Sequence, residues 1–298
     1  MIRASEFERM FGMNIAFIIF MNGLTYSGLL FMCASGLTLI FGLMRVVNMS
    51  HGIFYLLGAY IGWVVQRATG NWFLAIMAGG IFVGLLALVI KITLFKKVMG
   101  DDRQETLLTL GLTLVIGDAL LAYFGGMPQV ITASRLIART VSFGGIFFYP
   151  GSRLFILAVA IMQGVLLWLL MQKTRLGQII RAGVDNREMV SALGIDIERI
   201  FTVVFFLGGF LAGISGVMGG SYLAFTVGTD MNILTYSLVV VIVGGMGSLG
   251  GAALGALLVG MTDSITLALV PNLSMVFIFG ILMMVLAFRP NGIFGKGQ

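Results

Sequence analysis

The sequence has very few charged residues. Asp, Glu, Lys and Arg make up 10% of its 298 residues, whereas 59% are hydrophobic and the mean hydropathy is +1.07. Soluble globular domains carry about 25% charged residues, so this balance excludes a protein that folds in water. The composition predicts an all-α polytopic membrane protein whose residues 1–298 form a single transmembrane domain.

Cysteine and histidine are almost absent. Cys33 and His51 are the only residues of their kinds, which excludes a disulfide framework and a metal site built from several Cys or His ligands. We expect no metal ion and no cofactor bound by this chain. A structural role for His51, close to a break in a helix, is favoured over a proton-sensing or solute-lining role.

The sequence also lacks a phosphate-binding loop. The pattern G-x-x-x-x-G-K-[ST] does not occur, so the chain does not bind nucleotide by that route. A membrane protein of this kind is a passive pore, is driven by an ion gradient, or uses ATP hydrolysed by another subunit.

Long apolar runs account for most of the chain. At roughly 20 residues per span they predict about 8–10 transmembrane helices, at residues 10–44, 52–66, 72–95, 106–124, 153–171, 200–223, 233–247, 251–270 and 273–288. The first run is too long for one perpendicular span, the second is short, and a polar stretch at 45–52 separates them. This pattern predicts broken or re-entrant helices, which are tolerated where the break is buried in protein or lines a cavity.

A short sequence echo is compatible with an inverted repeat. Gly36-Leu-Thr-Leu-Ile-Phe-Gly42 resembles Gly111-Leu-Thr-Leu-Val-Ile-Gly117. Duplicated halves of transporters leave such traces, although a chance match is equally compatible with so apolar a chain.

The distribution of basic residues predicts the orientation. The net charge is +6, and nine crossings place most of the Lys and Arg residues on one side: Arg45, the 91–103 cluster, the 173–199 segment and the C-terminal tail. The positive-inside rule makes that side cytoplasmic. The same rule explains the basic residues without nucleic acid, which we do not expect as a partner.

One polar island, residues 172–199, interrupts the apolar segments. Within it, residues 186–193 place Met189, Val190 and Leu193 on one helical face, and Gly194 follows as a C-cap. A short amphipathic helix of this kind could dock into a groove of a soluble partner. The alternative is a solvated loop that keeps its charges out of the lipid.

Glycine is abundant, with 42 residues. Three Gly-x-x-x-Gly pairs, at 209/213, 216/220 and 251/255, predict close helix crossings. The segment Gly244–Gly251 contains too many glycines for a regular helix and predicts a tight turn, a hinge or exposed backbone amides.

Four segments together resemble the permeases of branched-chain amino acid ABC transporters. They are Gly36–Gly52 with Leu57-Gly-Ala-Tyr60, the pair Arg181-Ala182 and Ala192-Leu-Gly-Ile195, the run Phe206–Gly216, and the glycine-rich Val240–Ala256. The segments stand in the order of the family and run from residue 36 to 256.

The resemblance implies a permease subunit of an ATP-driven importer in the bacterial inner membrane, and not an enzyme. Its implied partners are two ATP-binding subunits, a second homologous permease, and a periplasmic or lipid-anchored binding protein that delivers the substrate. Residues that match the coupling element, or lie in the same island, are Arg181, Ala182, Arg187, Ala192, Gly194 and Ile195.

Candidate residues for the substrate path are Asn48, His51, Asp118, Gly244, Gly245 and Ser248. Asp118 departs from the family, in which its position is more often neutral, so the substrate stays open between branched-chain or related hydrophobic amino acids and urea, short amides or another small solute. From the residues alone, the intramembrane ionisable groups Asp118, Asp263 and Lys91 also allow an ion-coupled secondary transporter. An intramembrane enzyme is disfavoured because no nucleophile–base pair or metal cluster is visible.

Overall fold

The computed structural model describes residues 2–44, 48–98, 101–144, 147–185 and 187–295. Its helices are α1 (Ile2–Met44), α2 (His51–Thr69), α3 (Trp72–Ile90), α4 (Lys96–Val98), α5 (Asp102–Phe124), α6 (Gly151–Lys173), α7 (Arg175–Asp185), α8 (Arg187–Ala192), α9 (Ile197–Tyr222), α10 (Thr229–Gly244), α11 (Leu249–Leu269) and α12 (Ser274–Phe288). A π-turn, η1 (Lys91–Phe95), joins α3 to α4, and a 3-10 turn, η2 (Pro271–Leu273), precedes α12.

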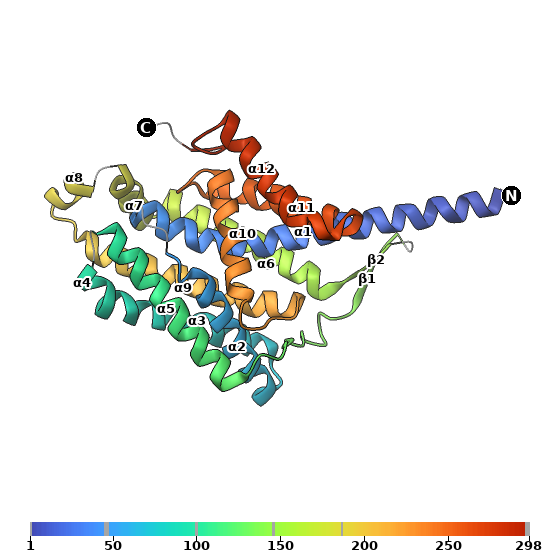
Figure 1. Ribbon diagram of the computed structural model, residues 1–298, viewed down its shortest axis with the longest axis horizontal. Helices are drawn as coiled ribbons and strands as arrows, with labels where there is room; N and C mark the ends of the chain where they lie inside the picture. Colours follow the sequence, from blue (N-terminus) through green and yellow to red (C-terminus); the bar gives the residue numbers. More distant parts are fainter. Residues whose placement is uncertain (1, 45–47, 99–100, 145–146, 186, 296–298) are drawn as a thin grey trace.

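Seven of the described helices are long and apolar enough to cross a membrane: α1, α3 with its π-turn, α5, α6, α9, α11 and α12 with η2. The shorter helices α2 and α10 lie among them (Figure 1). The all-α polytopic architecture expected from the hydropathy is therefore confirmed. The first apolar run, however, is one continuous helix, and the chain breaks only after Met44.

The basic segments gather at one end of the bundle. Figure 1 shows α4, α7 and α8 together at its left, and the β-hairpin described below at the opposite end. We call the first the basic end and the second the outer end. This arrangement matches the sides assigned from the Lys and Arg distribution.

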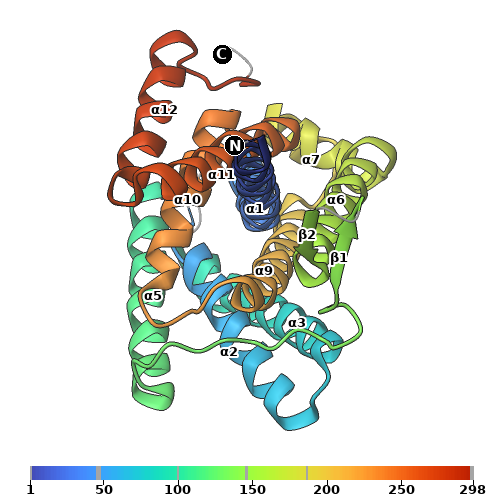
Figure 2. The same ribbon diagram turned by 90° about the vertical axis from the view of Figure 1, so that its right-hand side faces the viewer.

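Helix α9 lies between α1 on one side and α2 and α3 on the other (Figure 2), and α2 and α3 pack closely against it. A Cβ atom at Gly58 of α2 would lie 2.5 Å from Gly213 Cα, and one at Gly213 would lie 2.5 Å from the carbonyl oxygen of Gly79 in α3. Gly216 approaches the backbone of Tyr55 in the same way. The predicted close crossings are confirmed at Gly209/Gly213 and at Gly216, and they lie within this chain, whereas Gly220 faces the side chains of Phe225 and Ile131.

Helices α2 and α10 both begin deep inside the bundle. His51 Nε2 donates to the Cys33 carbonyl oxygen at 2.9 Å, and Cys33 lies eleven residues, or about 16 Å, before the end of α1. Gly52 in turn packs against the Asp230 carbonyl in the first turn of α10. The two helix N-termini therefore meet inside the bundle, about three turns along α1 from its end.

Two parts of the bundle have the same packing pattern, with their helices running in opposite directions. α1 packs antiparallel on α11 through Gly23/Met261 and Ser27/Gly260, and α9 packs on α3 through Gly213/Gly79. Each of α1 and α9 is followed by a six-residue linker and a helix that begins deep in the bundle. These features are those of an inverted repeat. The two segments of the sequence echo have different surroundings. A Cβ atom at Gly36 would lie 2.9 Å from the Gly208 carbonyl oxygen, whereas one at Gly111 would have no heavy atom within 4 Å.

The outer end carries a β-hairpin that sequence analysis left as a loop. β1 (Thr140–Phe143) pairs antiparallel with β2 (Phe147–Pro150). The buried Tyr149 hydroxyl donates to the Met21 carbonyl oxygen at 3.0 Å and lies 2.9 Å from Thr25 Oγ1. Burial raises the pKa of Tyr149 above its ordinary value, so the phenol stays protonated and anchors the hairpin to α1.

We predict that Gly213→Val lowers the stability of the protein by about 2 kcal/mol or more, because an added side chain would collide with the backbone of α3. Gly280→Val is the matched control, since no heavy atom lies within 4 Å of its Cβ position. Thermal melting of both variants in one detergent checks this. Equal melting temperatures would show that α9 and α3 can separate without cost.

Candidate functional site

The polar island folds as two helices at the basic end, and sequence analysis missed the first. In α7, Leu176, Ile179 and Ile180 recur at helical spacing, and Ile180 is buried against the bundle. This i, i+3, i+4 pattern could have identified the helix. α7 contacts α1, α6 and α9, so it joins the island to three membrane helices.

Helix α7 is also fixed to the end of α6. The Thr174 hydroxyl oxygen accepts the Gly177 N–H at 3.1 Å, as an N-cap does. The Arg181 guanidinium donates to the Met171 carbonyl oxygen in the last turn of α6. A cation at a helix C-terminus is favourable for the dipole and satisfies an otherwise unpaired carbonyl. These two bonds fix the start of α7 against the last turn of α6.

The structure of α8 contradicts the prediction of one apolar face. Val190 is 4% exposed and packs into the bundle, whereas Met189 and Leu193 are 63% and 74% exposed and point away from it. Val190 therefore does not share a face with Met189 and Leu193, because α8 lies on the bundle with Val190 turned inward. α8 is only six residues long, and Leu193 lies beyond its end. The predicted glycine turn is confirmed, since Gly194 has a φ of +78° and donates to the Ser191 carbonyl oxygen at 3.0 Å.

The other coupling candidates lie on the same surface. Ala182, Ala192 and Gly194 are exposed, and Ile195 is half-buried. Arg187 begins α8, but its side chain lies outside the described part of the chain.

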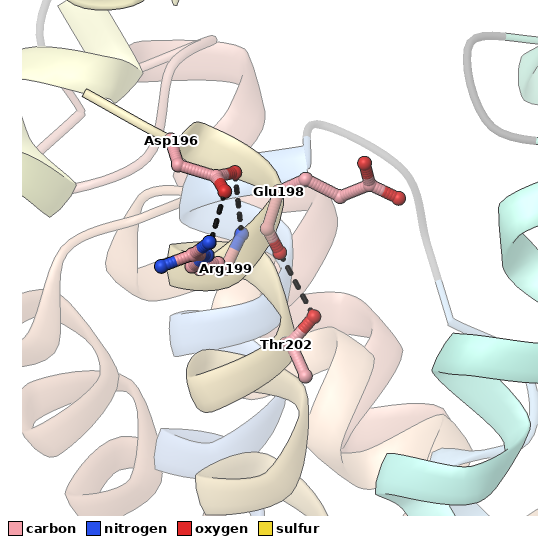
Figure 3. A network of polar contacts seen from close by, with 4 residues as sticks. All are labelled: Asp196, Glu198, Arg199 and Thr202. Atoms are coloured by element: carbon pink, nitrogen blue, oxygen red, sulfur yellow. Dashed lines mark hydrogen bonds and ion pairs between the residues drawn. The ribbon is translucent and has the colours of Figure 1, made fainter. Parts of the chain in front are cut away.

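Helix α9 begins at the edge of this surface with an aspartate cap (Figure 3). Asp196 Oδ1 accepts the Arg199 N–H at 3.1 Å, and Asp196 Oδ2 lies 2.7 Å from Arg199 Nε. The two side chains are 49% and 85% exposed, so their ion pair adds little stability. The cap fixes the residue at which α9 begins and hence the position of the preceding turn.

The break before α2 is buried and held by α5. Asn48 Oδ1 accepts the Ser50 N–H at 3.0 Å, and the Met49 N–H donates to Thr109 Oγ1 of α5 at 3.2 Å. Thr113 of the same helix donates to the Met49 carbonyl oxygen at 3.3 Å. Asn48 and His51 are both buried. The path candidates Asn48 and His51 therefore line this helix break.

Asp118 lies in a different environment. It is on the exposed face of α5, beside Leu114 and Val115, which are also exposed. Large apolar side chains are exposed along α3 and along the middle of α6, as at Leu85 and Leu166. A carboxylate that faces lipid within a membrane span is costly. The outward face of α5 therefore differs from the apolar outward faces of α3 and of the middle of α6.

The glycine-rich segment 244–251 is a tight turn covered by the C-terminal tail. Ser248 Oγ accepts the Gly251 N–H at 3.1 Å and so caps α11. The Ile293 N–H donates to the Val243 carbonyl oxygen at 2.9 Å, and the Phe294 N–H donates to that of Gly244 at 3.0 Å.

These bonds satisfy the last carbonyl groups of α10, which have no partner within the helix. The tail, residues 289–295, therefore clamps the end of α10 at Gly244 and Gly245. A side chain at Gly245 would collide with Gly295, and one at Gly292 would lie 2.5 Å from Gly245 Cα.

Within the described residues, no three His, Cys, Asp or Glu side chains come together in a group that could hold a metal ion.

The comparison with protein families decides the class of the chain. Residues 19–286 match the family model described as branched-chain amino acid transport system/permease component. The chain belongs to this family. No solved structure matches it.

Relatives in the family cover nearly the whole chain. The high-affinity branched-chain amino acid transport system permease protein BraD of Pseudomonas aeruginosa is 25% identical over 293 residues, which are 93% of this chain and 95% of BraD. LivH of Escherichia coli K12 is 26% identical over 308 residues, with 93% and 94% of the two chains covered. The fructose import permease protein FruF of Bifidobacterium longum is 32% identical over only 115 residues, or 36% of this chain.

Ile293→Pro tests the clamp. Proline has no N–H to donate to the Val243 carbonyl, and a buried acceptor left unpaired costs about 1–3 kcal/mol. We predict that hydrogen exchange at residues 243–251 becomes about tenfold faster. Ile293→Val keeps the N–H and is the control. Unchanged exchange in the proline variant would show that the tail does not hold this turn.

Proposed function

We propose that this protein is the permease subunit of an ATP-driven ABC importer for branched-chain amino acids, in the bacterial inner membrane. Membership of the permease family carries the proposal, and the relatives BraD and LivH are named for this transport. The lack of a phosphate-binding loop is consistent with it, because hydrolysis is then supplied by separate subunits.

The surface formed by α7, α8 and Gly194 is the proposed docking site of an ATP-binding subunit. It lies at the basic end, which the positive-inside rule makes cytoplasmic. Ala192 and Leu193 are exposed there, and an exposed apolar tip in water is typical of a protein interface. Ile180 and Val190 anchor the same element in the bundle.

The connections of this surface support a mechanical role. Arg181 joins α7 to the end of α6, and the turn at Gly194 leads into the capped start of α9. A displacement of α8 by the ATP-binding subunit therefore moves α6 and α9 together. Helix α9 carries the displacement to α2 and α3, which pack on it backbone to backbone.

The exposed face of α5 supports a second permease as the neighbour in the membrane. Asp118 lies on this face, and a carboxylate needs water or polar protein groups at that depth. The interface between two permeases would supply both water and polar protein groups. We propose that Asp118 faces the substrate path at this interface, and that a periplasmic or lipid-anchored binding protein delivers the substrate at the outer end.

Leu193→Asp tests the docking surface. We predict that the variant loses co-purification with its ATP-binding subunits and substrate-stimulated ATPase activity by about tenfold or more, because a charge would enter an apolar contact. Its melting temperature stays unchanged, since Leu193 is exposed. Leu136→Asp, equally exposed in the loop before the hairpin, is the control. Full ATPase activity in Leu193→Asp would exclude α8 from the contact.

The substitution Asp118→Leu tests whether the side chain at this position faces the substrate path or lipid. We predict that ATP-driven uptake by the reconstituted complex falls about tenfold or more, without a gain in stability. Against lipid, removal of the charge would instead stabilise the protein by about 2.5–3.5 kcal/mol and leave uptake intact. Val115→Leu, on the same exposed face, is the control for a change in shape. The lipid-facing result would contradict the placement of Asp118.

A further inference from the structure

The segment between α5 and the hairpin crosses the outer end of the bundle. Residues 125–139 leave α5 on one side, run past the end of α9 and reach β1 on the other side (Figure 2). On the way they meet the last turn of α9 and the linker between α9 and α10. We call the contact between residues 126–131 and residues 220–226 the latch.

Hydrogen bonds join the two parts of the latch. Gln129 and Phe225 form an antiparallel bridge, in which the Gln129 N–H donates to the Phe225 carbonyl oxygen at 2.8 Å and the Phe225 N–H donates back at 2.9 Å. Thr226 Oγ1 donates to the Gly126 carbonyl oxygen at 3.1 Å. The chain that follows α5 is therefore tied to the linker that follows α9.

Two buried side chains close the latch against the bundle. Ile131 is 1% exposed, and its N–H donates to the Gly220 carbonyl oxygen at 2.8 Å. Phe225 is 2% exposed, and its ring centroid lies 5.1 Å from that of Tyr60 in α2, edge-to-face. Tyr60 also stacks on Phe124, the last residue of α5, at 4.5 Å. The latch therefore lies beside the contact that holds the end of α5 on α2.

The two halves of α5 are attached differently. Its buried residues are Glu105, Thr109 and Thr113 in the half nearer the basic end, and Leu120 in the outer half. The hydrogen bonds of Thr109 and Thr113 to the backbone of Met49 fix the first half. The outer half is held by Leu120, by the aromatic stack at its end and by the latch. Release of the latch would free this half while the first half stays in place.

A glycine with a left-handed backbone adjoins each part of the latch. Gly125, with a φ of +73°, lies between α5 and the latch, and Gly228, with a φ of +101°, lies between the latch and α10. These conformations are open mainly to glycine, and segments that open and close commonly change direction at a few residues at the ends of helices. A change of direction at Gly125 and Gly228 lets the two parts separate while the helices keep their form.

We propose that the latch is a releasable closure of the outer end, which opens during transport so that the outer half of α5 moves away from the linker between α9 and α10. The proposal rests on the proposed function, because opening gives the substrate access to the face of α5 that carries Asp118. Asp118 lies six residues, or about 9 Å, before the end of α5. In the open form, water replaces the hydrogen bonds between the two parts.

A reversible cross-link tests the latch. Val130 and Ala224 are exposed and adjoin the bridge on its two sides. Antiparallel pairing places their Cα atoms about 4.5–5.5 Å apart, within the range of a disulfide. Cys33 is the only native cysteine and is buried, so oxidation of Val130→Cys/Ala224→Cys joins the new pair. We expect oxidation to lower ATP-driven leucine uptake by the complete complex about tenfold or more, because the outer end stays closed, and a reductant to restore it.

Ser142→Cys/Phe148→Cys is the matched control. These two residues face each other across the hairpin and are also exposed, so their disulfide lies at the outer end without joining the parts of the latch. We expect full uptake after its oxidation. Full uptake with the latch pair oxidised overturns the proposal. So does an equal loss with both pairs, since oxidation at the outer end would then act without the latch.

Hydrogen exchange separates this inference from the proposed function. In the full chain in nanodiscs without ATP, an opening latch exchanges the N–H groups of residues 126–131 and 223–226 at one common rate, and oxidation of the latch pair slows both about tenfold. If this is observed but the complete complex takes up no leucine, the latch stands and the importer assignment is wrong. If uptake is observed and oxidation changes neither uptake nor exchange, the latch is wrong and the importer assignment stands.

Discussion

The close packing of α9 against α2 and α3 is the contact on which the rest of the structure depends. Gly213 and Gly216 let the backbones approach within van der Waals distance, which in lipid replaces the hydrophobic effect as a source of helix association. Because α2 is held in this way, it can begin inside the bundle with His51 bonded to the Cys33 carbonyl. Asn48 and Ser50, which precede α2, are then buried by protein, as a membrane interior without water requires.

The same helix connects the two ends of the molecule. α9 begins at the Asp196 cap beside the proposed docking surface and ends at Tyr222 at the outer end. In the proposed coupling, the close contacts of α9 with α2 and α3 carry a force applied at α8 toward the outer end. The C-terminal tail links α12 to α10, because Ile293 and Phe294 bond to the last turn of α10.

The sequence predicts the transmembrane helices well because hydropathy and length are properties of single segments. It also predicts the glycine crossings and the turn at Gly194, since each follows from one residue type. The sequence does not predict features that depend on contacts between distant segments. The separation of Val190 from Met189 and Leu193 depends on how α8 lies on the bundle. The tail clamp joins residues fifty positions apart, so it has no local pattern. Of the features that sequence analysis missed, only α7 has a periodic pattern of apolar residues that could have identified it.

The central claim is that this permease moves its substrate only when ATP-binding subunits act on α7 and α8. The most direct test measures leucine uptake into proteoliposomes that contain the chain alone with a proton or sodium gradient, or the complete complex with ATP and the binding protein. We predict uptake by the complete complex and none by the chain alone. Gradient-driven uptake by the isolated chain would contradict the account.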